Sequence, residues 1–202
     1  MAESRTSEPG ADIVRLHERR LLARHCAGDE AAFAELLGTL GPAVYGYLRR
    51  RGFSGAELDD LYQEVFWRVH RSAARYQPDC PLRPWVFTIA INVARDHVRR
   101  RRVQAVLAGD RLPESADPRP GPGAVVEAKQ SADFLTAEIA RLPEPWRDAV
   151  DLICLQRLDQ RAAADLLGVP VNTVKTWLRR GRLALAQSLA RRDQGVHREA
   201  SR

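Results

Sequence analysis

The chain has 202 residues, and its 32 Lys and Arg against 26 Asp and Glu give a formal net charge of +6. This length fits one domain or two small ones, since domains commonly hold on the order of 100 to 150 residues. Three separated cysteines without a CxxC pair exclude a disulfide framework and a cysteine zinc site. No run is long and apolar enough to span a membrane, so we expect a cytoplasmic protein without membrane insertion.

The pattern along the chain predicts an all-α fold of two small helical domains joined by a flexible linker. Helical periodicity dominates up to about residue 101 and resumes near residue 125, with a Pro- and Gly-rich stretch between. The predicted parts are a disordered tail at 1–12, a helical bundle at 13–105, a linker at 106–127, a helix-turn-helix domain at 128–191 and a disordered tail at 192–202. Enzyme and metal-binding motifs are absent from the sequence, so we expect no catalytic residue, cofactor or metal.

Local signals place the first three helices. The first helix is predicted from about Ile13 to a stop at Gly28, and Asp29 then caps the second. Ser54 and Glu57 have the spacing of a capping box at the start of the third helix. The predicted buried stripe of that helix comprises Leu58, Leu61, Tyr62, Val65, Phe66 and Val69.

The other face of this third helix is acidic, although the chain as a whole is basic. Its residues are Asp59, Asp60, Gln63, Glu64 and Trp67. Charges on a helix usually form a solvated face, and that interpretation stays open. A large aromatic beside carboxylates favours instead a contact with a partner protein that carries basic residues.

The stretch PWVFTIAINVARDHVRRRR, from Pro84 to Arg102, combines an apolar helix with a strongly basic end. A single stripe along it holds Trp85, Thr88, Asn92, Arg95 and Arg99. Arg99, Arg100 and the two arginines after them suit duplex phosphates, while Trp85, with Tyr76 in the preceding loop, suits stacking on unpaired bases. The alternative is a core Trp85 and a basic helix end that complements the helix dipole.

The segment after residue 158 predicts a helix-turn-helix. Asp159 is a plausible N-cap, Gly168 ends a short helix, and a longer basic helix follows. The buried side of the longer helix is predicted to hold Val174, Leu178, Gly181 and Leu185. Its exposed side carries Lys175, Thr176, Arg179, Arg180 and Arg182. In a helix-turn-helix such residues contact base edges and phosphates in the major groove, whereas a helical hairpin with a basic face would have no such role.

These stretches together resemble the bacterial RNA polymerase sigma factors of the extracytoplasmic-function (ECF) type. DDLYQEVFWRVHR and PLRPWVFTIAINVARDHVRRRR are similar to sigma region 2, and the segment from LPEPWRDAV to RGRLAL is similar to sigma region 4. The resemblance implies binding of core RNA polymerase and promoter-specific initiation of transcription. It also implies two kinds of promoter DNA as partners, duplex and melted non-template strand, and an anti-sigma factor as a further partner.

The resemblance also implies a role for each group of residues. The acidic face (Asp59, Asp60, Gln63, Glu64 and Trp67) would bind polymerase. The −10 element and its melting would involve Tyr76, Trp85, Thr88, Asn92, Arg95, Arg99 and Arg100. The −35 element would be read by Thr176, Arg179 and Arg180, with Lys175 on phosphate. Ile91 and Trp177 stand where the family often has Arg, which puts one phosphate contact in each domain in doubt. The alternative function is a stand-alone helix-turn-helix regulator that does not act through polymerase.

Overall fold

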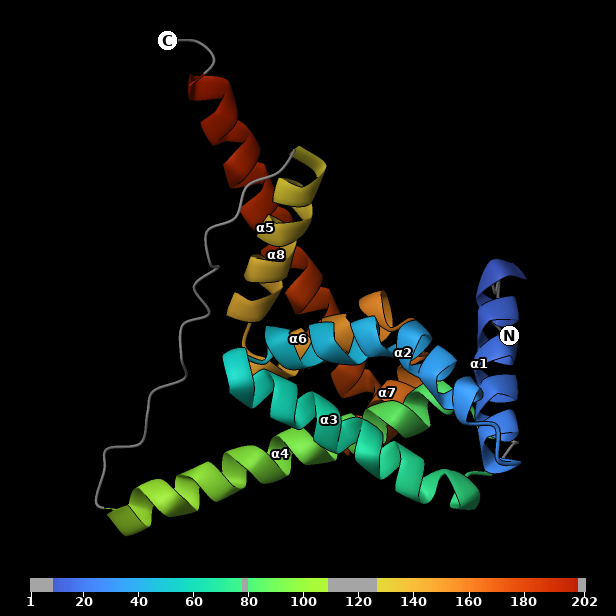
Figure 1. Ribbon diagram of the computed structural model, residues 1–202. Helices are drawn as coiled ribbons and strands as arrows, with labels where there is room; N and C mark the ends of the chain where they lie inside the picture. The colour runs from blue at the N-terminus through green and yellow to red at the C-terminus, as the bar shows by residue number, and fades with distance from the viewer. Residues whose placement is uncertain (1–8, 78–79, 109–126, 200–202) are drawn as a thin grey trace.

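The computed structural model describes residues 9–77, 80–108 and 127–199 and is all-α over these residues, as the sequence predicts. The N-terminal domain consists of α1 (Pro9–Cys26), α2 (Glu30–Arg50), α3 (Gly55–Ser72), the 3₁₀ turn η1 (Ala73–Arg75) and α4 (Leu82–Ala108). The C-terminal domain consists of α5 (Glu127–Arg141), α6 (Glu144–Val150), the π-helical turn η2 (Asp151–Leu155), α7 (Gln160–Leu167) and α8 (Val171–Glu199). Figure 1 shows these elements in chain order, with α4 and α8 as the two long helices.

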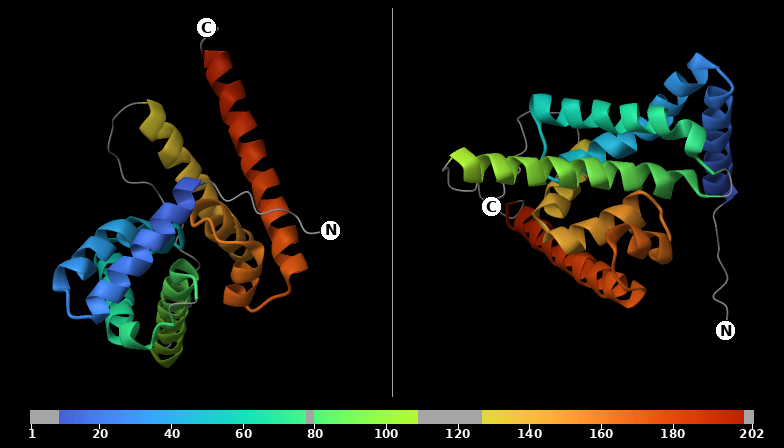
Figure 2. Two further views of the ribbon diagram at one scale, coloured as in Figure 1. Left: turned by 90° about the vertical axis from the view of Figure 1, so that its right-hand side faces the viewer. Right: turned by 90° about the horizontal axis from the view of Figure 1, so that it is seen from below.

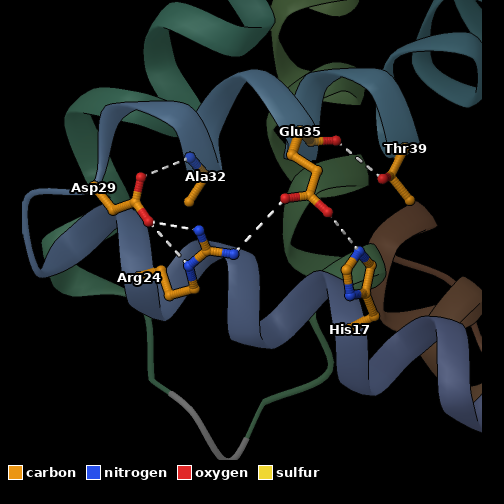
Figure 3. A network of polar contacts seen from close by, with 6 residues as sticks. All are labelled: His17, Arg24, Asp29, Ala32, Glu35 and Thr39. Atoms are coloured by element: carbon orange, nitrogen blue, oxygen red, sulfur yellow. Dashed lines mark hydrogen bonds and ion pairs between the residues drawn. The ribbon is translucent and has the colours of Figure 1, made fainter.

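The turn between α1 and α2 forms as predicted. Gly28 takes φ +96°, a left-handed conformation that Gly adopts without strain, and the Asp29 carboxylate accepts a hydrogen bond from the Ala32 amide at 3.1 Å. Arg24 donates to the same carboxylate at 2.6 Å and pairs with Glu35 at 3.7 Å, so one α1 side chain bridges two positions of α2 (Figure 3). The hydrogen bonds from Arg24 and Ala32 lower the pKa of Asp29 below its ordinary value.

Helix α3 buries the predicted stripe and begins after Ser54 as predicted, but it lacks the predicted capping bonds. Leu58, Leu61, Val65, Phe66 and Val69 are buried, and Tyr62 is half-buried against them. Ser54 occupies the N-cap position in extended conformation, yet its side chain makes no capping bond, so the predicted capping box is wrong. Glu57 accepts instead from His97 at 2.7 Å and from Arg101 at 2.8 Å, two residues of α4. The carboxylate therefore holds α4 against α3.

Helix α4 is one continuous helix that lies beside α3, and its C-terminal turns extend beyond α3 (Figures 1 and 2). Its inner face buries Val86, Phe87 and Ala90 completely. Its first turn is fixed by Arg83, whose Nη2 donates to Glu18 of α1 at 2.6 Å and whose Nε donates to both carboxylate oxygens of Glu18 at 3.1 Å. Glu18 is fully buried, and a buried carboxylate requires such a partner.

The C-terminal domain contains the predicted helix-turn-helix, with α7 and α8 as its two helices. The Asp159 carboxylate caps α7 by accepting from the Ala162 amide at 2.8 Å, and Gly168 ends it with φ +69°. The buried side of α8 is as predicted, with Val174, Leu178, Gly181 and Leu185 turned inward.

Gly181 allows close packing of α8 on α6, and its replacement by Ala is expected to destabilise the domain. An added Cβ would lie 2.6 Å from Val150 Cγ2 and 3.3 Å from the backbone oxygen of Trp146. We expect a loss of about 1–3 kcal/mol in the free energy of unfolding, measured by urea denaturation. The matched control is Gly38→Ala within α2, where an added Cβ meets no atom within 4 Å. Equal stability of both variants would contradict this account of the packing.

Both ends of the described chain are more helical than predicted. Helix α1 begins at Pro9 and α8 continues to Glu199, so both helices extend into the segments 1–12 and 192–202 that were predicted as tails. Proline is favoured in the first turn of a helix, and residues 192–199 contain no proline that would end α8. Most of the predicted linker, residues 109–126, lies outside the described residues, and its first three residues continue α4.

The two domains pack against each other, which the sequence does not predict. Helix α4 contacts α7, α2 contacts α5, and one hydrophobic core runs through both domains. At the end of α2, Arg50 pairs with Asp151 and Arg51 pairs with Asp148. We call these four residues the interdomain charge cluster.

Candidate functional site

The predicted acidic face is an exposed surface on α3. Asp59, Asp60, Gln63 and Trp67 are exposed, and Glu64 is half-buried. The Trp67 side chain is 53% exposed, which is unusual for so large an apolar group, and the Arg71 guanidinium lies 5.2 Å from its ring centre. Beside it, Tyr45 donates a hydrogen bond to Asp59 at 3.3 Å. An accessible aromatic among carboxylates has the character of a protein-binding surface.

A chain of ion pairs joins this acidic face to α4. Arg68 donates to Glu64 at 2.7 Å and pairs with Asp96 of α4 at 3.6 Å, while Asp96 also pairs with Arg99 at 3.1 Å. All four side chains are at least one-third exposed, so each pair contributes little to stability. These ion pairs orient the Glu64 and Arg99 side chains without burying either of them.

The predicted α4 stripe lies on one outward side of the helix. Thr88, Asn92, Arg95 and Arg99 are exposed, and Trp85 is half-buried at the start of the stripe. The Thr88 hydroxyl donates to the backbone oxygen of Pro84 at 2.8 Å. The sequence left two interpretations of Trp85 open, a base-stacking residue or a core residue. Trp85 lies between these two, because it packs against the core while one side of it remains accessible.

The structure brings Tyr76 and Trp85 together, although they lie on different elements. Their ring centres are 5.1 Å apart with a 55° angle between the planes, and the Tyr76 hydroxyl donates to the Cys80 carbonyl oxygen. Burial raises the pKa of the Tyr76 phenol above its ordinary value, so the group stays protonated and able to donate. The aromatic pair offers a stacking platform at one end of the α4 stripe.

The arginines at the end of α4 have different interaction partners. Arg99 and Arg100 are exposed, and both interact with Asp96 one turn earlier. Arg101 is held by Glu57 on the α3 side. Ile91, one of the two departures from the family pattern, is buried in the core and therefore makes no contact with phosphate.

The predicted basic face of α8 is exposed along its first three turns. Lys175, Thr176, Arg179, Arg180 and Arg182 are all exposed. The Arg180 guanidinium lies 5.9 Å from the ring centre of Trp146 on α6, which restrains its direction. Trp177, the second departure, is half-buried and packs against the core. The geometry is that of a helix-turn-helix with its second helix free to enter a groove.

Sequence reasoning missed the residues that position these surfaces. Glu18 and Glu57 both hold α4 through arginines far along the chain, and the interdomain charge cluster joins residues about one hundred positions apart. No local pattern marks such long-range partners. Among the described residues no cluster of three or more metal-binding side chains occurs, and no helix of the described chain is long and apolar enough to cross a membrane.

Two family models match the two domains. The model described as Sigma-70 region 2 matches residues 36–103, and that described as Sigma-70, region 4 matches residues 135–185. The first match covers most of α2 together with α3 and most of α4, and the second covers the helix-turn-helix.

Relatives found by sequence similarity agree with these matches. The chain is 34% identical to the ECF RNA polymerase sigma factor RpoE of Cereibacter sphaeroides, over 75% of this chain and 82% of that protein. It is 29% identical to the RNA polymerase sigma factor CnrH of Cupriavidus metallidurans, over 85% and 94% of the two chains. 

The fold is shared with two solved complexes. The structure of CnrH with the cytosolic domain of CnrY has a TM-score of 0.60 at 24% identity and covers 86% of this chain and 97% of that one. The sigma factor RpoE from Bartonella quintana, in complex with the anti-sigma factor NepR, has a TM-score of 0.64 at 20% identity and covers 78% and 96%. Both regions are matched in order, and a relative above 30% identity covers three-quarters of this chain, so this chain belongs to the ECF family of RNA polymerase sigma factors.

Proposed function

We propose that this sigma factor divides its work among the three exposed surfaces of α3, α4 and α8. The acidic face of α3 binds core RNA polymerase, with Trp67 as its aromatic anchor. The α4 stripe reads and opens the −10 element, and the first turns of α8 read the −35 element in duplex DNA. The sigma-factor family performs no covalent chemistry, and we extend this to the present chain, which would act on polymerase in the cytoplasm without a cofactor.

The observation that carries the proposal is the order of side chains along α4. The stripe passes from an aromatic pair, through an exposed amide at Asn92, to exposed guanidiniums at Arg95, Arg99 and Arg100. Unpaired bases stack on aromatic rings, and phosphates attract guanidiniums. This order therefore suits the junction between melted and duplex DNA better than it suits uniform duplex.

Melting in this proposal is driven by binding free energy. Unstacking and unpairing one base costs a few kcal/mol, and stacking of a base on an aromatic side chain returns about 1 to 3 kcal/mol. The Tyr76–Trp85 pair and Asn92 would hold a base taken out of the stack, while the arginines hold the adjacent duplex. Neither contribution alone offsets the cost of several base pairs, so both domains and polymerase are required.

An anti-sigma factor is proposed as a further partner, because the similar Bartonella quintana fold is solved in complex with one. A stand-alone helix-turn-helix regulator is not favoured, since the sequence similarity to sigma factors extends through α2, α3 and α4 as well as the DNA-binding helices.

Co-elution with core polymerase tests the proposal without knowledge of the promoter. Purified chain and bacterial core RNA polymerase are mixed at moderate salt and separated on a sizing column, and the holoenzyme is then used for transcription from a genomic library. We expect one complex and a limited set of promoters. A folded chain that stays separate from polymerase would contradict the proposal.

Replacing Asn92 by Ala tests the base-reading role of α4. We expect normal assembly with polymerase and a loss of roughly tenfold or more in promoter opening, since one good base contact is worth about 1–3 kcal/mol. Permanganate reactivity of unpaired thymines measures the opening. The matched control is Gln104→Ala, which removes an exposed amide from another face of the same helix. Equal opening by both variants would remove Asn92 from the site.

A further inference from the structure

Helix α4 carries a single carboxylate among the arginines that are proposed to hold DNA. From Leu82 to Ala108 the sequence has six arginines and one acidic residue, Asp96. Asp96 lies four residues after Asn92 and three before Arg99, so it is a neighbour of both on the helix surface. The proposed −35 helix α8 has no Asp or Glu from residue 171 to residue 192. Because a carboxylate repels phosphate, the position of Asp96 beside the α4 stripe requires a reason.

The Asp96 carboxylate bridges two arginines. Its Oδ1 accepts a hydrogen bond from Arg99 Nη2 at 3.1 Å, and its Oδ2 pairs with Arg68 Nη1 of α3 at 3.6 Å. Arg68 is held in turn by Glu64, to which its Nε donates at 2.7 Å. Asp96 is therefore restrained by α3, and it in turn restrains Arg99.

The contact with Asp96 orients the Arg99 guanidinium without using all of its donors. The Arg99 side chain is 77% exposed and the Asp96 side chain 38%. A guanidinium has five N–H donors in a planar fork, so a bond through Nη2 leaves others for a phosphate. An exposed ion pair is weak, so Arg99 can leave Asp96 at a small cost in free energy. Asp96 therefore favours one direction of Arg99 over the others and does not prevent its use.

A fixed direction of Arg99 gives the α4 stripe a fixed register on DNA. Asn92 and Arg99 are seven residues apart, which is about 10 Å along the helix axis at about 1.5 Å per residue. This length is the rise of roughly three base pairs. A guanidinium held at this interval grips one phosphate when the proposed base contact of Asn92 forms. It fits phosphates at other offsets poorly, because it must first leave Asp96.

We propose that Asp96 is a positioning residue of the α4 stripe: it holds Arg99 for the phosphate of the correct register and lowers the affinity of α4 for DNA in other registers. This inference rests on the proposed function of α4. Specificity is a difference between two affinities, and a repulsive group that acts mainly on the wrong complex increases that difference. A helix with arginines alone would bind any duplex through its phosphates.

Binding to random-sequence DNA tests the proposal in the full chain. The test variant is Asp96→Ala, and the matched control is Asp133→Ala, which removes an exposed carboxylate from α5 and changes the net charge equally. We expect Asp96→Ala to bind random-sequence duplex roughly threefold more tightly than the wild type, with a salt dependence steeper by about one phosphate contact. The control should change neither quantity. Fluorescence anisotropy at several salt concentrations measures both.

The same variant should lose discrimination as part of the holoenzyme. Each holoenzyme is compared on a promoter recovered from the genomic library and on the same promoter with a scrambled −10 element. We expect the ratio of the two affinities to fall roughly fivefold in Asp96→Ala, since the gain on the wrong DNA adds to the lost orientation on the right one. The ratio should be unchanged in Asp133→Ala. A merely structural role of Asp96 would weaken binding to random-sequence duplex and could not tighten it.

Two further variants identify the partner through which Asp96 acts. In Asp96→Ala combined with Arg99→Ala, the gain in affinity for random-sequence duplex should disappear, because Asp96 acts through Arg99. Arg68→Met removes the link to α3 and leaves the contact between Asp96 and Arg99, so most of the discrimination should be retained. Equal loss of discrimination in Arg68→Met and Asp96→Ala would assign the effect to the packing of α4 on α3 and overturn the positioning role. Urea denaturation confirms that each variant is folded.

Two results separate this inference from the proposed function. An Asp96→Ala variant that binds random-sequence duplex and discriminates as the wild type does, together with normal assembly and promoter opening, would overturn the role of Asp96 and leave the proposed function intact. A gain in duplex affinity that requires Arg99, together with a wild type that does not bind polymerase, would support the restraint of Arg99 by Asp96. The same result would overturn the proposed function on which its promoter role rests.

Discussion

Replacing Asp60 and Glu64 together by Arg is expected to abolish assembly with core RNA polymerase while leaving the fold intact. Asp60 is exposed on α3 and Glu64 is half-buried beside it. Charge reversal turns attraction to a basic partner surface into repulsion, and each reversed contact is expected to cost about 2–5 kcal/mol. Titration of labelled chain with core polymerase should show at least ~100-fold weaker binding.

The control for this double variant carries the same change in charge elsewhere. Glu30→Arg with Asp133→Arg reverses two exposed carboxylates, one on α2 and one on α5. The control should bind polymerase as the wild type does. Equal weakening in both variants would mean that polymerase responds to overall charge, and the acidic face of α3 would then lose its assigned role.

Replacing Arg179 and Arg180 together by Ala is expected to remove recognition of the −35 element. Each arginine is exposed on the basic face of α8, and a bidentate contact to guanine is worth about 1–3 kcal/mol. The holoenzyme should still assemble, because these residues are on α8, whereas the acidic face proposed to bind polymerase is on α3. Promoter affinity and its dependence on salt, measured by fluorescence anisotropy, should both fall.

A scrambled −35 element provides the sharpest comparison for this variant. Wild-type holoenzyme should distinguish the native promoter from one with a scrambled −35 element, and the double variant should not. Arg191→Ala, an exposed arginine three turns further along α8, should retain the discrimination. Continued discrimination by the double variant would mean that other residues of the domain read the −35 element.

Local features of the fold were predictable because their causes lie within a few residues. The caps at Asp29 and Asp159 and the left-handed Gly168 are confirmed, since each depends on backbone groups within three or four positions. The buried stripe of α3 follows from helical periodicity alone. The capping box at Ser54 failed because a carboxylate three residues later found partners on another helix.

The candidate surfaces were predictable as exposed faces, but not as an arrangement. Periodicity tells which α4 residues share a side, and the structure places Thr88, Asn92 and Arg99 on an accessible one. Periodicity does not predict that Tyr76 contacts Trp85 or that Arg50 pairs with Asp151, because those contacts depend on how separate helices pack. The residue roles on these surfaces remain predictions for the experiments above.

The continuity of α4 has a consequence for how promoter preference can change. Trp85 and Arg99 are fourteen residues apart on one unbroken helix, which is about 21 Å at about 1.5 Å per residue. That length equals the rise of roughly six base pairs. Under the proposed function, the helix therefore sets a fixed distance between the opened base and the duplex upstream. An inserted residue would rotate everything beyond it by about 100°, so descendants of this chain are expected to change the bases they read by substitution and to keep the interval.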